Sequence, residues 1–198
     1  MQNELWFRPL VWMDYRLAVL FTVFIPLVLL IWAFVQKAEA IQRLLTIYWR
    51  VSSLLMIALY LLIAALPAGF IADLMARILI PISLWFWVDL NEEIEDQPQG
   101  ALKFTFNSWR WAISIYSLVG ALAQIPSLQC AVSKNVITSS FCRAFLEPPL
   151  LFKEYFHANS TPQALGFIGI VALIIYLSCL IYFVFVKLGK QGRSAIQQ

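Results

Sequence analysis

The sequence predicts an all-α integral membrane protein, a bundle of about five transmembrane helices that forms one domain over residues 1–198. Of the 198 residues, 62% are hydrophobic and 13% are charged, whereas a soluble domain carries about 25% charged residues. The formal net charge is only +3, and no cluster of Lys and Arg alternates with aromatic residues, so we expect no nucleic acid partner. The expected environment is the lipid bilayer.

Five apolar segments account for the predicted spans, because a helix needs about 20 mostly apolar residues to cross a bilayer. The segment 70–88 is the one that includes two charged residues, Asp73 and Arg77. These residues are four positions apart and share a helix face, with the acid on the favourable N-terminal side. We interpret this segment as a span that carries an intramembrane ion pair. The expected spans are 17–35, 51–68, 70–88, 111–128 and 165–186.

The distribution of Lys and Arg predicts the orientation of these spans, because basic residues favour cytoplasmic loops. Five spans put eight basic residues on one side and five on the other. The expected N-terminus is therefore lumenal and the expected C-terminus cytoplasmic. The cytoplasmic set is Lys37, Arg43, Arg50, Lys103, Arg110, Lys187, Lys190 and Arg193, and the opposite set is Arg8, Arg16, Lys134, Arg143 and Lys153.

The longest expected loop, 129–164, faces the non-cytoplasmic side in this topology and contains Cys130 and Cys142. Two cysteines in an extracytoplasmic loop favour a disulfide bond over two free thiols. Further along the loop, the segment 147–157 begins with EPP and places its apolar side chains on one face. This pattern predicts an interfacial helix with prolines in its first turn.

An acidic cluster follows Trp85 and Trp87, and it could be a metal site, an acid/base site or a docking surface. The sole histidine of the chain, His157, lies in the loop on the opposite side. A cluster flanked by Gln, Pro and Gly is expected to be solvated, so neither a metal site nor a catalytic site is expected. We interpret the cluster as the cytoplasmic end of the third helix, which docks a basic partner surface. Its members are Asp89, Glu92, Glu93, Glu95 and Asp96.

Two polar features inside the spans have competing interpretations. Gln124 could ligate a pigment weakly, but a hydrogen bond between helices is favoured. The Asp73–Arg77 pair could be a proton or substrate relay, since ionisable residues inside membranes often have such roles. A structural pair is favoured, because transporters usually show internal repeats or broken helix pairs.

Six distinctive segments are spread over nearly the whole chain: PLVWMDYRLAV (9–19), IYWRVSSL (47–54), ILIPISLWFWVDLNEEIED (78–96), WRWA (109–112), LEPP (146–149) and KQGR (190–193). Together they resemble a cyanobacterial family of small polytopic membrane proteins that is known only as a domain of unknown function. The resemblance implies a photosynthetic bacterial host and a thylakoid membrane, with the cysteine loop in the lumen. It implies no catalytic residues.

Two classes of function remain open at this stage. The first is a non-catalytic accessory or assembly subunit of a photosynthetic complex, which contacts lipid and requires no cofactor, although lipid, chlorophyll or carotenoid could bind at its helix surfaces. The second is a small transporter or membrane-embedded enzyme that uses Asp73, Arg77 and the acidic cluster.

Overall fold

The computed structural model describes residues 6–132, 134–137 and 139–188. In this part of the chain all regular secondary structure is helical. Five helical segments are long and apolar enough to cross a membrane, which confirms the predicted fold class. They are Arg8–Val35, Glu39–Ile63, Ala68–Trp85, Ala101–Ala131 and Pro162–Leu188.

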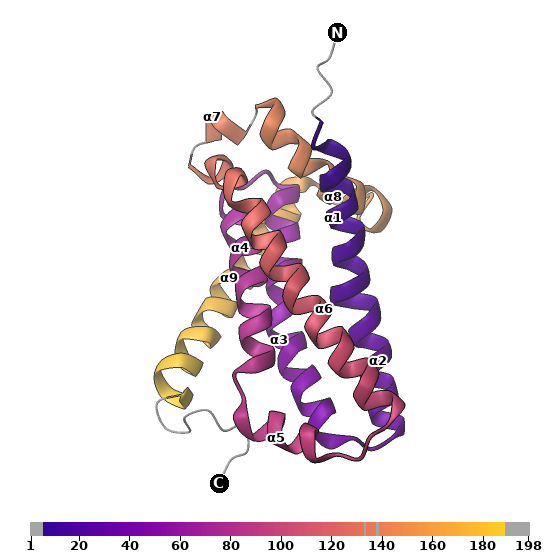
Figure 1. The fold of residues 1–198 in the computed structure, drawn as a ribbon. Coiled ribbons are helices and arrows are strands. Elements are labelled where there is room, and N and C mark those ends of the chain that lie inside the picture. The colour runs from indigo at the N-terminus through magenta and orange to yellow at the C-terminus, as the bar shows by residue number, and fades with distance from the viewer. Residues whose placement is uncertain (1–5, 133, 138, 189–198) are drawn as a thin grey trace.

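Three of these segments change helix type along their length, and shorter helices join them (Figure 1). The long segments comprise α1 (Arg8–Val19), the π-helix η1 (Leu20–Phe24) and α2 (Ile25–Val35); α3 (Glu39–Ile63); α4 (Ala68–Trp85); α6 (Ala101–Gln124) with the 3-10 helix η2 (Ile125–Ala131); and α9 (Pro162–Tyr182) with the π-helix η3 (Phe183–Leu188). The shorter helices are α5 (Val88–Asp96), α7 (Lys134–Ile137) and α8 (Ser140–Phe156).

The spanning helices begin earlier than the sequence indicates, most of all α3, α6 and α1. All three extensions include charged residues, which the hydropathy argument excludes from the spans. In α6, the Arg110 guanidinium lies 3.6 Å from the centre of the Trp85 ring, so its charge stacks on an aromatic face. In α1, the extension includes Asp14, whose partner is described below. Charged residues therefore lie within the spans because other side chains compensate them.

Packing centres on α3, which contacts α4 and α9 along much of its length. The π-helix η1 is bound to the neighbouring helices by side chains. Tyr48 of α3 donates a hydrogen bond of 2.9 Å to the Thr22 carbonyl, and Trp109 of α6 donates one of 2.9 Å to the Phe21 carbonyl. A π-helix disrupts the regular backbone ladder, and these two donors satisfy carbonyl groups at the disruption.

The last span, α9, lies at the edge of the bundle (Figure 1) and packs closely on α3 through two glycines. A Cβ atom at Gly166 would lie 2.4 Å from the Cβ of Ala64, and one at Gly169 would lie 3.1 Å from Leu61. Small residues permit such close helix approach in membranes. Most other α9 side chains are exposed, as expected of a helix that faces lipid.

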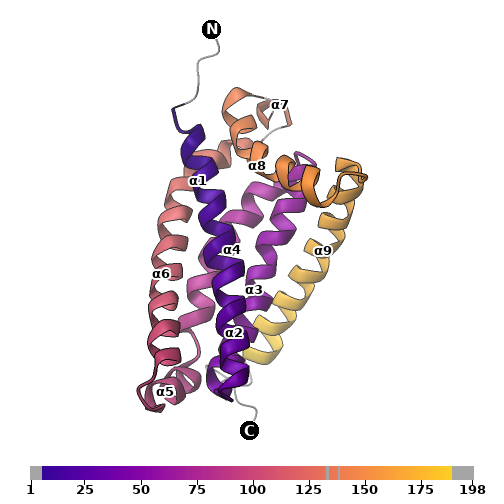
Figure 2. The same ribbon diagram turned by 90° about the vertical axis from the view of Figure 1, so that its right-hand side faces the viewer.

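Two short helices differ from the expectation. The acidic cluster does not extend the third span, because α4 ends at Trp85 and an extended Trp87 precedes the separate helix α5. Helix α8 begins at Ser140, so Pro148 and Pro149 lie inside the helix rather than in its first turn. The cap is Ser139, whose hydroxyl accepts a hydrogen bond from the Cys142 amide. Figure 2 shows α8 and α5 at opposite ends of the bundle.

The orientation of this bundle can be tested with engineered cysteines. Cys130 and Cys142 are themselves buried, whereas Glu154 on α8 and Glu95 on α5 are exposed. In a Cys179→Ser background, we expect a membrane-impermeant thiol reagent to label Glu154→Cys only from the lumenal or periplasmic face. The same reagent should label Glu95→Cys only from the cytoplasmic face.

Labelling of both positions from one face would show that α6 does not cross the membrane, and exchanged faces would contradict the orientation or the span 70–88. Two of the basic residues behind that orientation, Lys190 and Arg193, lie outside the described residues.

Candidate functional site

An arginine inside the membrane forms a forked contact between two spans. Arg77 of α4 donates hydrogen bonds from both terminal nitrogens to Asp14 of α1, with distances of 3.2 Å from Nη1 to Oδ1 and 2.5 Å from Nη2 to Oδ2. The Arg77 side chain is only 10% exposed. A bidentate pair of this kind fixes both distance and orientation, so it determines where α1 lies relative to α4.

Helix α6 completes a polar network around this pair. Tyr116 donates its hydroxyl proton to Asp14, where Oδ1 lies at 2.6 Å and the backbone oxygen at 2.9 Å. Gln124 donates a hydrogen bond of 2.6 Å to Oδ2 of Asp73. The same Oδ2 lies 3.6 Å from Nε of Arg77. We refer to Asp14, Asp73, Arg77, Tyr116 and Gln124 as the polar network; it joins α1, α4 and α6.

Glycine at position 120 makes room for the guanidinium. A Cβ atom there would lie 2.0 Å from Nη1 of Arg77 and 3.2 Å from its Cζ. Tyr116, one helical turn earlier, places its ring 5.8 Å from the guanidinium carbon. Arg77 therefore lies against the bare backbone of α6 with an aromatic ring beside it.

The polar network contains two carboxyl groups and one guanidinium. If both carboxyl groups are ionised, its formal charge is −1. Gln124 is 8% exposed, and its carbonyl oxygen has no hydrogen-bond partner among the described residues. A buried acceptor without a donor costs free energy unless water or a ligand supplies one.

A cavity of about 720 Å³ lies beside the polar network, between α1, α3, α4 and α6 and beneath α8. All five network residues line it, and most of the remaining lining is aliphatic or aromatic. Pockets of about 300–1,000 Å³ with a few polar groups in an apolar wall are typical of small-molecule sites. This cavity is therefore the candidate site of the protein.

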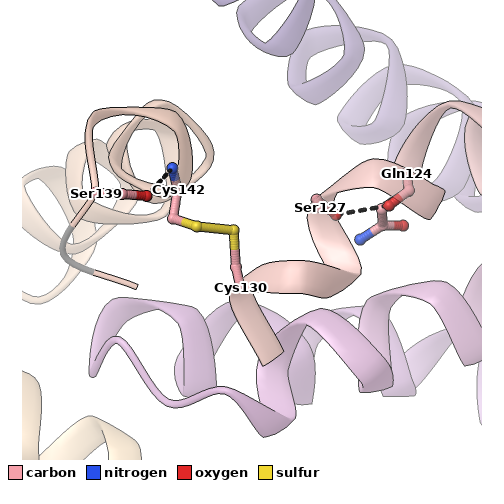
Figure 3. The surroundings of a disulfide bond; sticks show 5 residues. All are labelled: Gln124, Ser127, Cys130, Ser139 and Cys142. Carbon is pink, nitrogen blue, oxygen red and sulfur yellow. Dashed lines mark hydrogen bonds between the residues drawn. A yellow bond between two sulfur atoms is a disulfide. The ribbon is translucent and has the colours of Figure 1, made fainter. Parts of the chain in front are cut away.

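A disulfide bond anchors α8, which forms the roof of the cavity. Cys130 at the end of η2 and Cys142 in α8 are the two residues expected to pair, and they are joined with a Cα–Cα distance of 5.8 Å (Figure 3). In the same figure, Ser127 donates a hydrogen bond of 2.8 Å to the backbone oxygen of Gln124. Helix α8 is thus tied to the turn that carries Gln124.

The roof is tied to α1 by a second set of contacts. Oε2 of Glu147 in α8 accepts hydrogen bonds from Arg8 at 2.8 Å and from Trp12 at 3.2 Å. His157, which follows α8, lies 3.0 Å from the Tyr60 hydroxyl. Side chains of α8 therefore bridge α1 on one side and α3 on the other.

The acidic cluster lies at the opposite end of the bundle. On α5, Leu90 and Ile94 are buried against the bundle, and Lys103 donates hydrogen bonds of 2.6 and 2.8 Å to the backbone oxygens of Glu95 and Gln97. A lysine at the end of a helix satisfies its last carbonyl groups. Helix α5 therefore lies against the end of the bundle, with its apolar face inward and its polar face turned outward.

The five acids of the cluster differ in their surroundings. The side chains of Glu92, Glu95 and Asp96 are exposed and make no ion pair within the described part of the chain. Glu93 lies 3.9 Å from Arg43, and Asp89 is half-buried. No group of three potential metal ligands occurs among the described residues.

Sequence reasoning identified only part of the polar network. It proposed Asp73 as the partner of Arg77, but the closer partner is Asp14, because a side chain from another helix can approach the guanidinium head-on. Gln124 does bond another helix, through Asp73. Asp14 and Tyr116 were missed. Asp14 as the single carboxylate of α1 was the available signal, since a charge inside a membrane needs a partner.

The chain belongs to the family described as "Protein of unknown function (DUF3177)", whose model matches residues 8–196. This match confirms the resemblance to a family of unknown function over nearly the whole chain. No curated protein and no solved structure matches the chain.

Removal of the two carboxylates should have unequal effects. Asp14→Ala leaves the forked face of Arg77 without a partner, so we expect a loss of about 3 kcal/mol in the free energy of unfolding. Asp73→Ala removes a longer contact and one hydrogen bond, and should cost about 1 kcal/mol. Titration with a denaturing detergent measures both. Equal losses, or a larger loss for Asp73→Ala, would contradict the assignment of Asp14 as the main partner.

A methyl group at position 120 should have opposite effects in two backgrounds. In the natural chain, Gly120→Ala displaces Arg77, so we expect a net loss of about 2 kcal/mol. In the neutral variant Asp14→Asn/Asp73→Asn/Arg77→Leu, the same change should stabilise by about 1 kcal/mol, the usual gain of Gly to Ala inside a helix. Unfolding titrations of the four proteins provide the comparison, and a loss in both backgrounds would show that other atoms fill the space.

Proposed function

We propose that this member of the DUF3177 family is a non-catalytic accessory or assembly subunit of a larger membrane protein complex. The complex is a photosynthetic one in the thylakoid membrane, as the resemblance of the segments quoted above implies. The exposed acidic face of α5, formed by Glu92, Glu95 and Asp96, docks a basic surface of that complex. The observation that carries the proposal is the unequal placement of acids and bases at this end of the bundle.

Two bases close to α5, Lys103 and Arg110, are turned away from its outer face. Lys103 is 8% exposed and donates to backbone carbonyls at the end of α5. Arg110 is 5% exposed and lies over Trp85. Beside this face, Glu93 makes a long contact of 3.9 Å with the exposed Arg43, whereas Glu92, Glu95 and Asp96 make no ion pair within the described part of the chain. A surface with uncompensated charge attracts a partner of opposite sign and accelerates its association.

The attachment of α5 also supports a docking role. Leu90 and Ile94 bury the apolar face of the helix, and Lys103 satisfies its C-terminal end. The helix is therefore held in place before any partner binds. A rigid surface loses less conformational entropy on association than a flexible one.

A second candidate, a small transporter or membrane-embedded enzyme, is favoured by the cavity beside Asp73 and Arg77. The acidic cluster would have no part in it, because α5 and the cavity roof lie at opposite ends of the bundle (Figure 2). The variant Asp14→Asn/Asp73→Asn/Arg77→Leu separates the two candidates. An accessory subunit should still associate with its complex when these groups are neutral, whereas a transporter or enzyme should lose its activity.

The docking proposal predicts that association depends on the summed charge of α5. Surface charge pairs contribute about 0–1 kcal/mol each, so single changes should have little effect. We expect Glu92→Gln/Glu95→Gln/Asp96→Asn to accumulate normally and to lose about tenfold in co-purification of the complex from mild detergent. We expect association of the natural chain to weaken as salt rises, since such attraction is screened beyond about 8–10 Å at physiological ionic strength.

Two variants control this experiment. Arg43→Gln removes a base beside Glu93 and makes the face more acidic, so association should strengthen. Glu154→Gln removes an exposed acid from α8 at the other end and should change nothing. Unchanged association of the triple variant, together with indifference to salt, would rule out docking through α5.

A further inference from the structure

We propose that the cavity binds one amphipathic lipid, which has an uncharged head with hydroxyl groups and inserts its hydrocarbon tail between α1 and α3. The head lies against Gln124 in the polar network. This site is independent of the docking face on α5, and either proposal can fail without the other.

The shape of the cavity fits a hydrocarbon chain. Its lining extends along α1 and η1 from Val11 to Phe24, and along α3 from Leu62 to Trp49. Each stretch covers about 20 Å at the usual rise of 1.5 Å per residue. A cavity of this length reaches most of the way through a hydrocarbon core of about 30 Å. The lining along both stretches is predominantly apolar, as a lipid tail requires.

The way α1 is held explains why the cavity exists. Helix α1 continues directly into η1, and its backbone packs closely against α8. Toward α4 and α6, it is joined by the side chains of Asp14, Arg77 and Tyr116. These long polar side chains bridge the helices, and the cavity lies beside the bridge.

The polar network favours a head that donates hydrogen bonds. The carbonyl oxygen of Gln124 is a buried acceptor without a partner among the described residues. Both terminal nitrogens of Arg77 already donate to Asp14. The remaining nitrogen, Nε, makes no hydrogen bond but faces the Asp73 carboxylate at 3.6 Å. An anionic head would therefore meet two carboxyl groups and no pair of vacant guanidinium nitrogens. A hydroxyl group can donate to Gln124 without such repulsion.

A cationic head is less suitable than a hydroxyl group. Transfer of an ammonium ion from water into the membrane carries a desolvation penalty of several kcal/mol, well above that of a hydroxyl group. The Arg77 guanidinium also lies on the same cavity wall as Gln124. The remaining choice is an uncharged head with several hydroxyl groups.

The test measures which lipid the full-length protein retains. Vesicles contain equal amounts of three lipids with identical tails and with a hexosyl, a phosphoethanolamine or a phosphocholine head. After reconstitution and extraction in mild detergent, native mass spectrometry counts the bound lipids. We expect about one hexosyl lipid per chain and about a tenfold preference over phosphocholine, the effect of one hydrogen bond to a buried acceptor. Preference for either phospholipid would overturn the proposal.

Three variants locate the bound lipid. Ala18 lines the cavity one helical turn after Asp14 and is not itself part of the polar network, so Ala18→Leu should reduce retention by at least about fivefold through loss of tail volume. Gln124→Leu should abolish the preference for the hexosyl head. Ala123→Leu adds the same volume at an exposed position of α6 and should retain lipid as the natural chain does.

Melting temperatures verify that each variant is folded. If Gln124→Leu fails to fold, Ala18→Leu decides the question. Retention unchanged in Ala18→Leu would show that the lipid lies outside the cavity and would overturn the proposal.

Discussion

The contact between Arg77 and Asp14 determines where α1 lies relative to α4 and α6. Neither charge is stable alone in a bilayer, because separation leaves each one desolvated and unpaired. The pair therefore holds α1 at the distance that two long side chains require. Gly120 leaves the space for the guanidinium, and Tyr116 fixes the carboxylate from the third helix. The cavity follows from this spacing, since helices bridged by side chains cannot also pack with their backbones in contact.

The two ends of the bundle hold their short helices by different chemistry. At the α5 end, buried Leu90 and Ile94 and the inward-facing Lys103 suffice, and they leave the acids outward. At the α8 end, a covalent bond between Cys130 and Cys142 adds about 3 kcal/mol by the chain-entropy argument. The first arrangement needs only water on one side of the helix. The second needs an oxidising compartment.

The sequence was sufficient to predict the number of spans, the cysteine pair and the involvement of Asp73 and Arg77, because hydropathy and residue spacing are local properties of the chain. It did not predict the role of Asp14. Hydropathy windows exclude charged residues, whereas the structure pairs this one with a residue far along the chain. The limits of α8 were missed for a related reason. Pro148 and Pro149 predict a helix start, but the Ser139 cap lies further upstream, and a capping hydroxyl is a weaker signal than two prolines.

The position of α9 has a consequence for biogenesis. This helix is synthesised after the other four described spans, and its closest packing is onto α3. The four earlier spans already contain the polar network and the core around Tyr48 and Trp109. They can therefore associate in the bilayer before α9 is synthesised, in keeping with stepwise assembly of independently stable helices. The close approach of Gly166 to Ala64 then allows α9 to pack against α3 without rearranging the four helices made before it.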